Sequence, residues 1–397
     1  MTRAETQFVV ALDVGTSGVR CLISEGTGLN SSKVIGKAKV GSRGIRKGEV
    51  VHFHDAMRSV KAAVERAAAM AGVKVVSVFA TLGCGGVRGL NSRGMVHLDR
   101  GVKATSPEVV DRATAAACDV SIPSDRVKLH ALPRGLSVDG LRCSRSGEGV
   151  SGEKLESEVH VITASREAAD KLEKVVNGAG YRLEKAAAEP LATGFAVLSE
   201  EERSRGVDLL KLGAGSTCLI SFREGVPSHT STLGVGGEHI VNDVAVATHV
   251  GTSEARQLWR NLGDGVECGV GDSPEDMGIE VAHARIQEIV GLARVELTKT
   301  GHLRPAESGL RLWGTLSEIP GVVEQAGAVM MKSVRMGELF ETQDILEAPQ
   351  EKEYATAVGL LVYGWRYRCE ADEFDLTAER PAMGWVARAL QRVAQIL

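Results

Sequence analysis

Two short glycine turns contain the residues best suited to chemistry. Backbone N–H groups in a tight turn can surround an anion, and small side chains let the anion approach. Each turn lies between two apolar runs, so both predict a strand-turn-strand hairpin that binds phosphate. The first turn, in "LDVGTSGVR", contributes Asp13, Gly15, Thr16 and Ser17. The second, in "LLKLGAGSTC", contributes Lys211, Gly213, Gly215, Ser216 and Thr217.

The charged residue that precedes each turn differs. Asp13 could hold the water shell of a Mg²⁺ ion beside phosphate groups. Lys211 stands at the matching place in the second hairpin, where a cation would repel a metal ion. We hypothesise that the Lys211 ammonium pairs with Asp13 or neutralises a phosphate directly; the alternative is that it lies at a wet edge and swings away when Mg-ATP binds. Asp208 cannot replace the missing acid, because an offset of three residues on a strand points it to the other face.

Composition indicates a multidomain globular protein. The chain has 397 residues, more than one hydrophobic core usually serves, and alternating strand and helix patterns favour an α/β fold with two similar lobes. A net charge of −4 gives no electrostatic reason to expect nucleic acid. The seven cysteines show no C-x-x-C pair, and no apolar run approaches the ~20 residues of a spanning helix. His52 and His54 have i, i+2 spacing, which we interpret as a solvent-facing strand rather than a metal site.

Several longer stretches resemble the FtsA family of actin-like bacterial division proteins. They are "ALDVGTSGVRCLISE", "SRGIRKGEV", "LNSRGMV", "SGEKLESEVHVIT", "AAAEPLATGFAVLSEEE", "STLGVGGEHIVNDVA", "VRMG" and "YATAVGLLVYG". The resemblance implies an actin-like, two-lobed α/β fold in which an inserted small α/β domain replaces one subdomain. The implied organisation is a first lobe at 6–84 and 161–197, an inserted domain at 85–160, a second lobe at 198–236 and 307–366, a smaller subdomain at 237–306, a linker at 369–384 and a terminal helix at 385–397.

The same resemblance implies a nucleotide site, with ATP and Mg²⁺ as expected ligands. Glu189 matches the position that orients the attacking water in related ATPases. Further nucleotide contacts are implied for Gly236, Gly237, Arg256, Trp259 and Gly314. The family's Asp-Ile-Gly-Gly-Gly-Thr-Thr-Asp loop has become Lys211 to Cys218, without either acid. Lys211, Arg256, Trp259 and Trp313 therefore argue against a bound Mg-ATP and against fast hydrolysis.

The final residues predict an amphipathic helix. At 3.6 residues per turn the apolar side chains fall within one arc, and the polar ones fill the opposite face. An apolar face flanked by arginines suits an anionic membrane surface, and the acidic linker would give a reach of ~20–25 Å. Docking of this helix onto the protein body is the alternative. The expected membrane-binding residues are Trp385, Val386, Arg388, Ala389, Leu390, Arg392, Val393, Ile396 and Leu397.

The resemblance implies a protein that self-assembles, binds the C-terminal peptide of FtsZ and other division proteins, and holds FtsZ filaments on the cytoplasmic side of the inner membrane at the division site. No nucleic-acid partner is expected. Two alternatives stay open at this stage. One is an active ATPase of the sugar-kinase or Hsp70 type, and the other is a pilus-assembly actin homologue that binds a different peptide.

Overall fold

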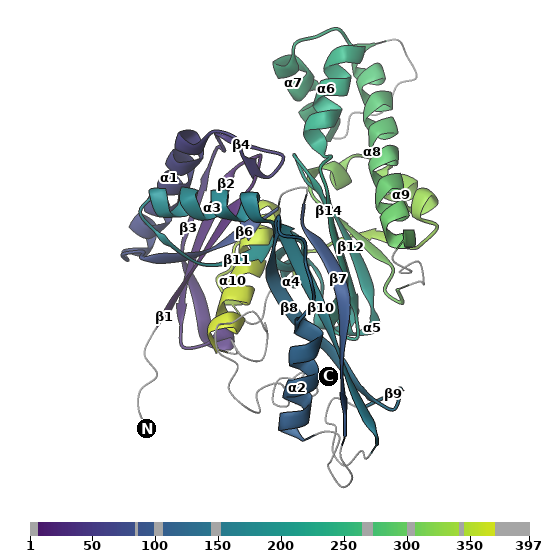
Figure 1. Cartoon of the computed structure of the whole chain (residues 1–397). Helices are drawn as coiled ribbons and strands as arrows, with labels where there is room; N and C mark the ends of the chain where they lie inside the picture. The colour runs from purple at the N-terminus through teal and green to yellow at the C-terminus, as the bar shows by residue number, and fades with distance from the viewer. Residues whose placement is uncertain are drawn as a thin grey trace.

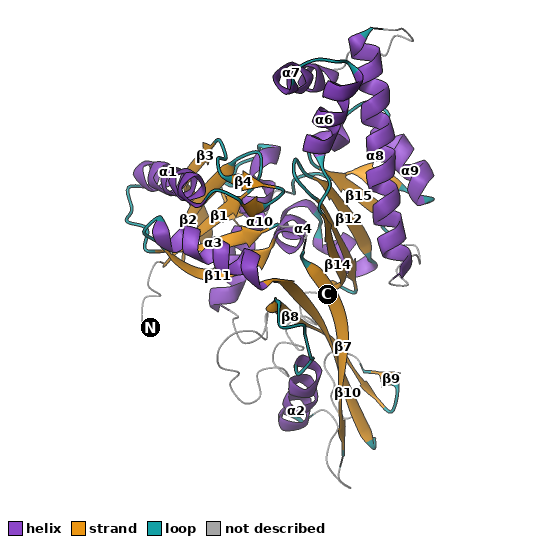
Figure 2. Ribbon diagram, turned by 45° about the horizontal axis from the view of Figure 1, so that its top comes forward, coloured by secondary structure: helices purple, strands orange, loops and turns teal. Residues whose placement is uncertain are grey.

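Two α/β lobes lie side by side, and a smaller unit extends from beneath them (Figures 1 and 2). The computed structural model describes residues 7–83, 86–98, 106–143, 152–263, 273–299, 306–340 and 345–369. The α/β fold with two lobes is therefore confirmed. The terminal helix predicted at 385–397 lies outside the described residues, as does the predicted linker except for Cys369.

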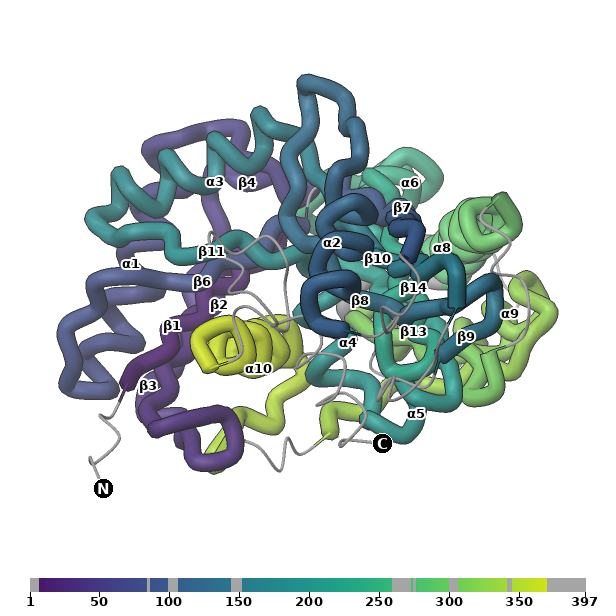
Figure 3. Tube along the Cα trace, turned by 60° about the horizontal axis from the view of Figure 1, so that its bottom comes forward, coloured from purple at the N-terminus to yellow at the C-terminus, as the bar shows by residue number. Residues whose placement is uncertain are grey.

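The first lobe is built on a six-stranded sheet of order β11-β6-β1-β2-β3-β17. Helices α1 and α3 cover one face of this sheet, and α10 covers the other (Figure 3). In α3, Ala168, Leu172, Val175 and Val176 form the buried stripe, which is the period expected of an amphipathic helix. The bounds are β1 Gln7–Val14, β2 Val19–Gly26, β3 Ser32–Val40, β6 Ser77–Leu82, β11 Arg182–Ala188, β17 Ile345–Leu346, α1 Phe53–Ala71, α3 Arg166–Gly178 and α10 Ala355–Cys369.

The second lobe shares one nine-stranded sheet with the inserted unit. Its order is β16-β15-β12-β13-β14-β7-β10-β8-β9, and β14 meets β7 where Ser231 pairs with Arg88. Helix α2 covers one face of the inserted part, close to β7 and β10. The strands are β7 Arg88–His97, β8 Arg126–Val138, β9 Leu141–Arg142, β10 Lys154–Ser165, β12 Val207–Leu212, β13 Thr217–Arg223, β14 Val226–Leu233, β15 Leu310–Trp313 and β16 Val334–Met336; α2 is Pro107–Cys118.

Helices α6, α7 and α8 form the part of the second lobe that projects at the top of Figure 1, and α9 packs beside α8 closer to the sheet. They bury a second apolar cluster that includes Ile240, Ile286 and Val290. The bounds are α4 Glu189–Val197, α5 Glu200–Arg205, α6 Gly237–Ala247, α7 Thr252–Gly263, α8 Pro274–Lys299, α9 Val322–Met330, β4 Ile45–Arg46, β5 Glu49–Val50, η1 Leu29–Ser31, η2 Thr315–Glu318 and η3 Lys352–Tyr354.

Each glycine turn joins two antiparallel strands into a hairpin, as predicted. In the first, β1 pairs with β2 and Asp13 lies opposite Arg20; in the second, β12 pairs with β13 and Lys211 lies opposite Cys218. The strand expected around His52 and His54 is wrong. His52 is the N-cap of α1 and His54 lies in its first turn, because the apolar residues that follow, from Ala56 to Ala67, repeat at helical spacing and form the buried stripe of α1.

Helices α4 and α10 pack against each other between the lobes (Figure 1). Their closest approach is at Gly359, where an added Cβ would overlap the carbonyl oxygen of Ala192. A glycine is therefore required by packing at this point, despite its cost of ~1 kcal/mol in a helix relative to alanine.

We expect Gly359→Ala to lower the free energy of unfolding by about 1–3 kcal/mol, because the two helix backbones must move apart. Gly291→Ala in α8 is the matched control, since no atom lies within 4 Å of its added Cβ. The control should be neutral or slightly stabilising. Urea unfolding followed by circular dichroism measures both, and equal stability of the two variants would contradict the close contact.

Candidate functional site

The two glycine turns face each other across a cavity of about 570 Å³ between the lobes. A volume of this size suits a small-molecule ligand. Its wall contains most of the residues that the sequence analysis selected from the turns, together with Glu189 and Gly314. The selected residues on the wall are Asp13, Gly15, Thr16, Ser17, Glu189, Lys211, Gly213, Gly215, Ser216, Trp313 and Gly314.

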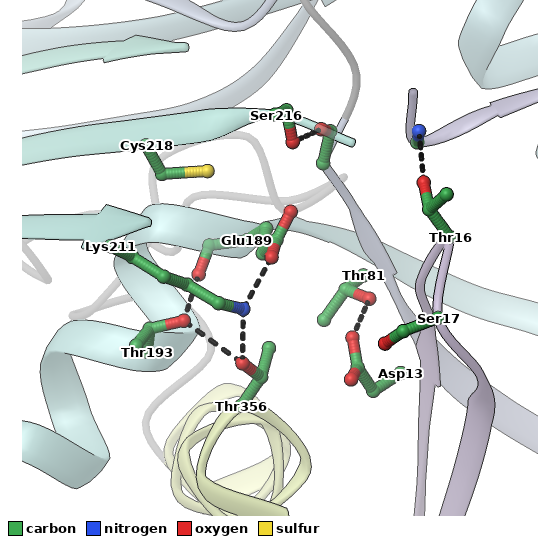
Figure 4. A network of polar contacts seen from close by, with 12 residues as sticks. Asp13, Thr16, Ser17, Thr81, Glu189, Thr193, Lys211, Ser216, Cys218 and Thr356 are labelled. Atoms are coloured by element: carbon green, nitrogen blue, oxygen red, sulfur yellow. Dashed lines mark hydrogen bonds and ion pairs between the residues drawn. The ribbon is translucent and has the colours of Figure 1, made fainter. Parts of the chain in front are cut away.

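Asp13 is held by two neighbours at the end of β1. The Thr81 hydroxyl donates to Asp13 Oδ1 at 2.9 Å (Figure 4). Arg20 Nη1 lies 3.4 Å from Asp13 Oδ2. Arg20 also donates to the Gly18 carbonyl oxygen at 3.2 Å and to the Ser17 hydroxyl at 3.4 Å. Its guanidinium therefore lies within the first turn and neutralises the carboxylate that we expected to serve a metal ion.

Arg20 is one of several residues on the cavity wall that the sequence analysis missed; the others with charged or hydroxyl side chains include Lys39, Glu318, Lys352, Glu353 and Thr356. A usable signal was present for Arg20, because a hairpin whose four-residue turn spans Gly15 to Gly18 places residue 20 directly opposite residue 13. Oppositely charged residues at such cross-strand positions attract each other.

The Lys211 ammonium pairs with Glu189, which corrects the hypothesis that it pairs with Asp13. Lys211 Nζ contacts Glu189 Oε1 and donates to the Thr356 hydroxyl at 2.7 Å. Figure 4 shows the side chain directed toward Glu189 at the start of α4 and Thr356 at the start of α10, while Asp13 lies beyond it beside Thr81. The physical reason is that Arg20 already neutralises Asp13, whereas Glu189 has no other cation partner among the described ion pairs.

Burial alone would lower the pKa of Lys211, but the negative charges of Glu189 and Asp13 outweigh it and leave the pKa above its ordinary value. The ammonium is therefore charged at neutral pH. Cys218, opposite Lys211 on β13, is buried, and burial together with the Glu189 charge raises the pKa of its thiol well above the usual range. Cys218 is thus a neutral neighbour of the ion pair.

Glu189 begins α4 directly after β11, where an extended Ala188 precedes the helix. Its carboxylate lies against Gly83, so closely that an added Cβ there would overlap Glu189 Oε2. Between Gly83 and the Lys211 ammonium, the carboxylate is fixed in place. Glu189 lies on the cavity wall and its carboxylate is paired with the Lys211 ammonium, so its role in orienting water stays a prediction.

The second turn touches the first lobe directly. Ser216 Oγ donates to the Gly83 carbonyl oxygen at 3.1 Å, and a Cβ added at Gly215 would lie 2.5 Å from Thr16 Oγ1. Glycine is needed at position 215 for this approach of the two turns. Thr217, Gly236 and Gly237 lie behind the turn and are not part of the cavity wall. The Gly237 amide donates to the Gly213 carbonyl oxygen at 3.0 Å, so it supports the turn.

The structure describes only part of the cavity side at which a nucleoside is expected. Trp313 is buried beside Lys211 on the wall, and Gly314 follows it with a φ of 106°, which favours glycine. Arg256 is exposed on α7 and does not line the cavity. The side chain of Trp259 lies outside the described residues. Nucleotide contacts of Arg256 and Trp259 stay predictions.

Asp208 points away from the cavity, as the strand alternation predicts. It is fully buried, with Arg223 Nη2 at 3.0 Å and Lys332 Nζ at 2.9 Å from its two carboxylate oxygens. Within the described ranges there is no group of three or more side chains able to hold a metal ion. No described helix combines the length and hydropathy needed to span a membrane.

Two α/β lobes joined by α4 and α10 around a cleft with two glycine turns define an actin-like protein, here with an inserted domain in the first lobe's sequence. Solved structures agree on this class. The PilM-PilN type IV pilus biogenesis complex matches with a TM-score of 0.63 and 19% identity, over 90% of this chain and 98% of that one. MreB 5 of Spiroplasma citri, bound to AMPPNP, matches with a TM-score of 0.51 and 11% identity, over 93% and 98%.

Sequence relatives define the family more narrowly. A family model described as "Cell division protein FtsA" matches residues 209–359, and one described as "SHS2 domain inserted in FTSA" matches residues 85–163. Cell division protein FtsA of Pseudomonas aeruginosa is 32% identical over 375 residues, which cover 90% of this chain and 89% of that protein. The chain belongs to the FtsA family of cell division proteins.

Proposed function

We propose that this chain self-assembles and tethers FtsZ filaments to the cytoplasmic face of the bacterial membrane at the division site, without fast ATP hydrolysis. The observation that carries the proposal is the 32% identity with a cell division protein FtsA across nine-tenths of the chain. The amphipathic pattern of residues 385–397 supports the membrane contact. One such helix binds weakly, so firm attachment calls for several copies in one assembly.

The low hydrolytic activity follows from the arrangement of the cavity wall. A carboxylate orients water or accepts a proton best when its oxygens are free to contact that water. Glu189 contacts the Lys211 ammonium and is pressed against Gly83, while Asp13 contacts Arg20. This arrangement argues against the active-ATPase alternative.

The membrane proposal predicts that the full chain carries FtsZ filaments into the pellet with anionic lipid vesicles. A chain ending at residue 384 should bind the FtsZ C-terminal peptide but leave the filaments in the supernatant. In the full chain, Leu390→Glu should prevent vesicle binding, because it places a charge in the expected apolar face, whereas the matched polar-face variant Gln391→Ala should retain it.

Two outcomes would count against this proposal. Vesicle binding by the shortened chain would remove the role assigned to residues 385–397. Failure of the FtsZ peptide to bind, with vesicle binding intact, would favour a membrane-associated actin homologue with a different partner peptide.

A further inference from the structure

Every carboxylate on the described cavity wall has a cation of the same chain beside it. Asp13 pairs with Arg20 and Glu189 pairs with Lys211 at the floor. At the rim, Lys352 lies 2.6 Å from Glu318, and Lys39 contacts Glu353. The charges of these eight wall residues cancel.

Such a wall does not fit a divalent metal ion. Mg²⁺ is held through carboxylates and substrate phosphates, and a neighbouring cation in a confined site repels it. The Lys211 ammonium occupies the space beside Glu189, and the Arg20 guanidinium occupies the space beside Asp13. A Mg²⁺ ion would have to displace both.

The same wall can still receive an anion. Compared with a carboxylate at position 211, an ammonium changes the charge of the wall by two units, which equals the charge of one Mg²⁺ ion. We propose that the cleft binds the phosphate groups of a nucleoside di- or triphosphate without a divalent metal, with Lys211 and Arg20 supplying the positive charge. The inference deepens the proposed function, on which it rests in treating the cleft as a nucleotide site.

Both cations retain hydrogen-bonding capacity for such a ligand. An ammonium has three N–H donors, and the contacts described for Lys211 use two of them, to Glu189 and Thr356. Arg20 is only 9% exposed, and its Nε has no hydrogen-bond partner among the described residues.

Strong metal-free binding also agrees with the shape of the site. The glycines of both turns let an anion approach the backbone, and the two turns lie in contact through Gly215 and Thr16. The cavity volume of about 570 Å³ exceeds what a bare phosphate needs. Its wall continues from the Lys211 ammonium to Trp313, where a ring of the ligand could lie.

The test is calorimetric titration of the full chain with ADP and with ATP, each in excess magnesium and in excess chelator. We expect each nucleotide to bind more tightly in chelator than in excess magnesium, because magnesium occupies the phosphate groups in solution and the wall repels the ion. Equal affinities in the two buffers would mean that the cleft accepts the metal complex, which would overturn the inference. Inorganic tripolyphosphate in chelator is a further arm; binding as tight as that of ATP would assign the site to polyphosphate rather than to nucleotide. Binding that needs magnesium, or no binding in either buffer, would overturn the inference.

A variant that reverses the charge at position 211 tests the role of Lys211. Lys211→Asp should lose at least about tenfold in chelator and recover with magnesium, and its melting temperature should rise when magnesium is added alone. Lys37→Met is the matched control, because Lys37 forms an ion pair with Glu351 at 2.7 Å but does not line the cavity. A Lys211→Asp variant that binds equally well in chelator would contradict the role of Lys211. None of these outcomes depends on FtsZ or vesicles, so they leave the tethering proposal to its own test.

Discussion

Lys211→Met is expected to lower the free energy of unfolding by about 3 kcal/mol, which is the lower end of the effect found when one partner of a buried ion pair is removed. The side chains of Lys211 and Glu189 are only 14% and 16% exposed. Methionine fills a similar volume but supplies no charge, so the Glu189 carboxylate would stay buried against Gly83 without a cation. The Thr356 hydroxyl would also lose its donor.

The double variant Lys211→Met, Glu189→Gln should recover most of this loss, because it removes the unpaired charge. Urea unfolding of the parent, both single variants and the double variant completes the thermodynamic cycle. The measurement belongs at neutral pH, since the raised pKa of Lys211 keeps its ammonium charged there. Above its folded pKa the ammonium loses its proton, so the stability that the pair contributes should disappear in strong alkali. A single variant as stable as the parent at neutral pH would show that water screens the pair.

The sequence predicts the hairpins well and their ionic partners poorly. Strand and turn patterns are local, so β1, β2, β12 and β13 follow from a few adjacent residues. The partner of Lys211 is Glu189, the first residue of α4. The position of α4 depends on its packing against α10, which is distant in the sequence and leaves no local signal. Charge alone could not choose between Asp13 and Glu189. Cross-strand register could have excluded Asp13, because it assigns Arg20 to that carboxylate.

The sequence patterns also could not predict which strands pair where the second lobe meets the inserted unit. Strands β14 and β7, adjacent in the shared sheet, come from distant parts of the chain, and their backbone pairing leaves no periodic signal in the sequence. His160 illustrates this difficulty. It is fully buried on β10, with Nε2 3.0 Å from the Thr230 hydroxyl on β14 and Nδ1 2.7 Å from Asn91 Oδ1 on β7. Three polar residues that seem ordinary in the sequence thus meet inside the shared sheet.

Asp208→Ala should be among the most destabilising single substitutions in the second lobe, at about 3–5 kcal/mol. The Asp208 side chain is fully buried and accepts from both Arg223 and Lys332. Lys332 is 6% exposed, so without Asp208 its ammonium would be buried with no counter-charge in this network. Arg223 is less affected, because it also donates to the Phe222 carbonyl oxygen at 2.7 Å.

Asp243→Ala is the matched control, since Asp243 lies 2.6 Å from Arg285 in a pair that is about one-third exposed and should contribute less than about 1 kcal/mol. Urea unfolding compares the two variants, and equal losses would mean that burial of Asp208 has no energetic weight. Calorimetry adds a second readout. Asp208 faces away from the cavity, so the Asp208→Ala protein that stays folded should bind nucleotide with unchanged dependence on magnesium, whereas Lys211→Asp should not. The two charged positions of β12 then separate by function: Asp208 stabilises the lobe, and Lys211 determines which charges the cleft can accept.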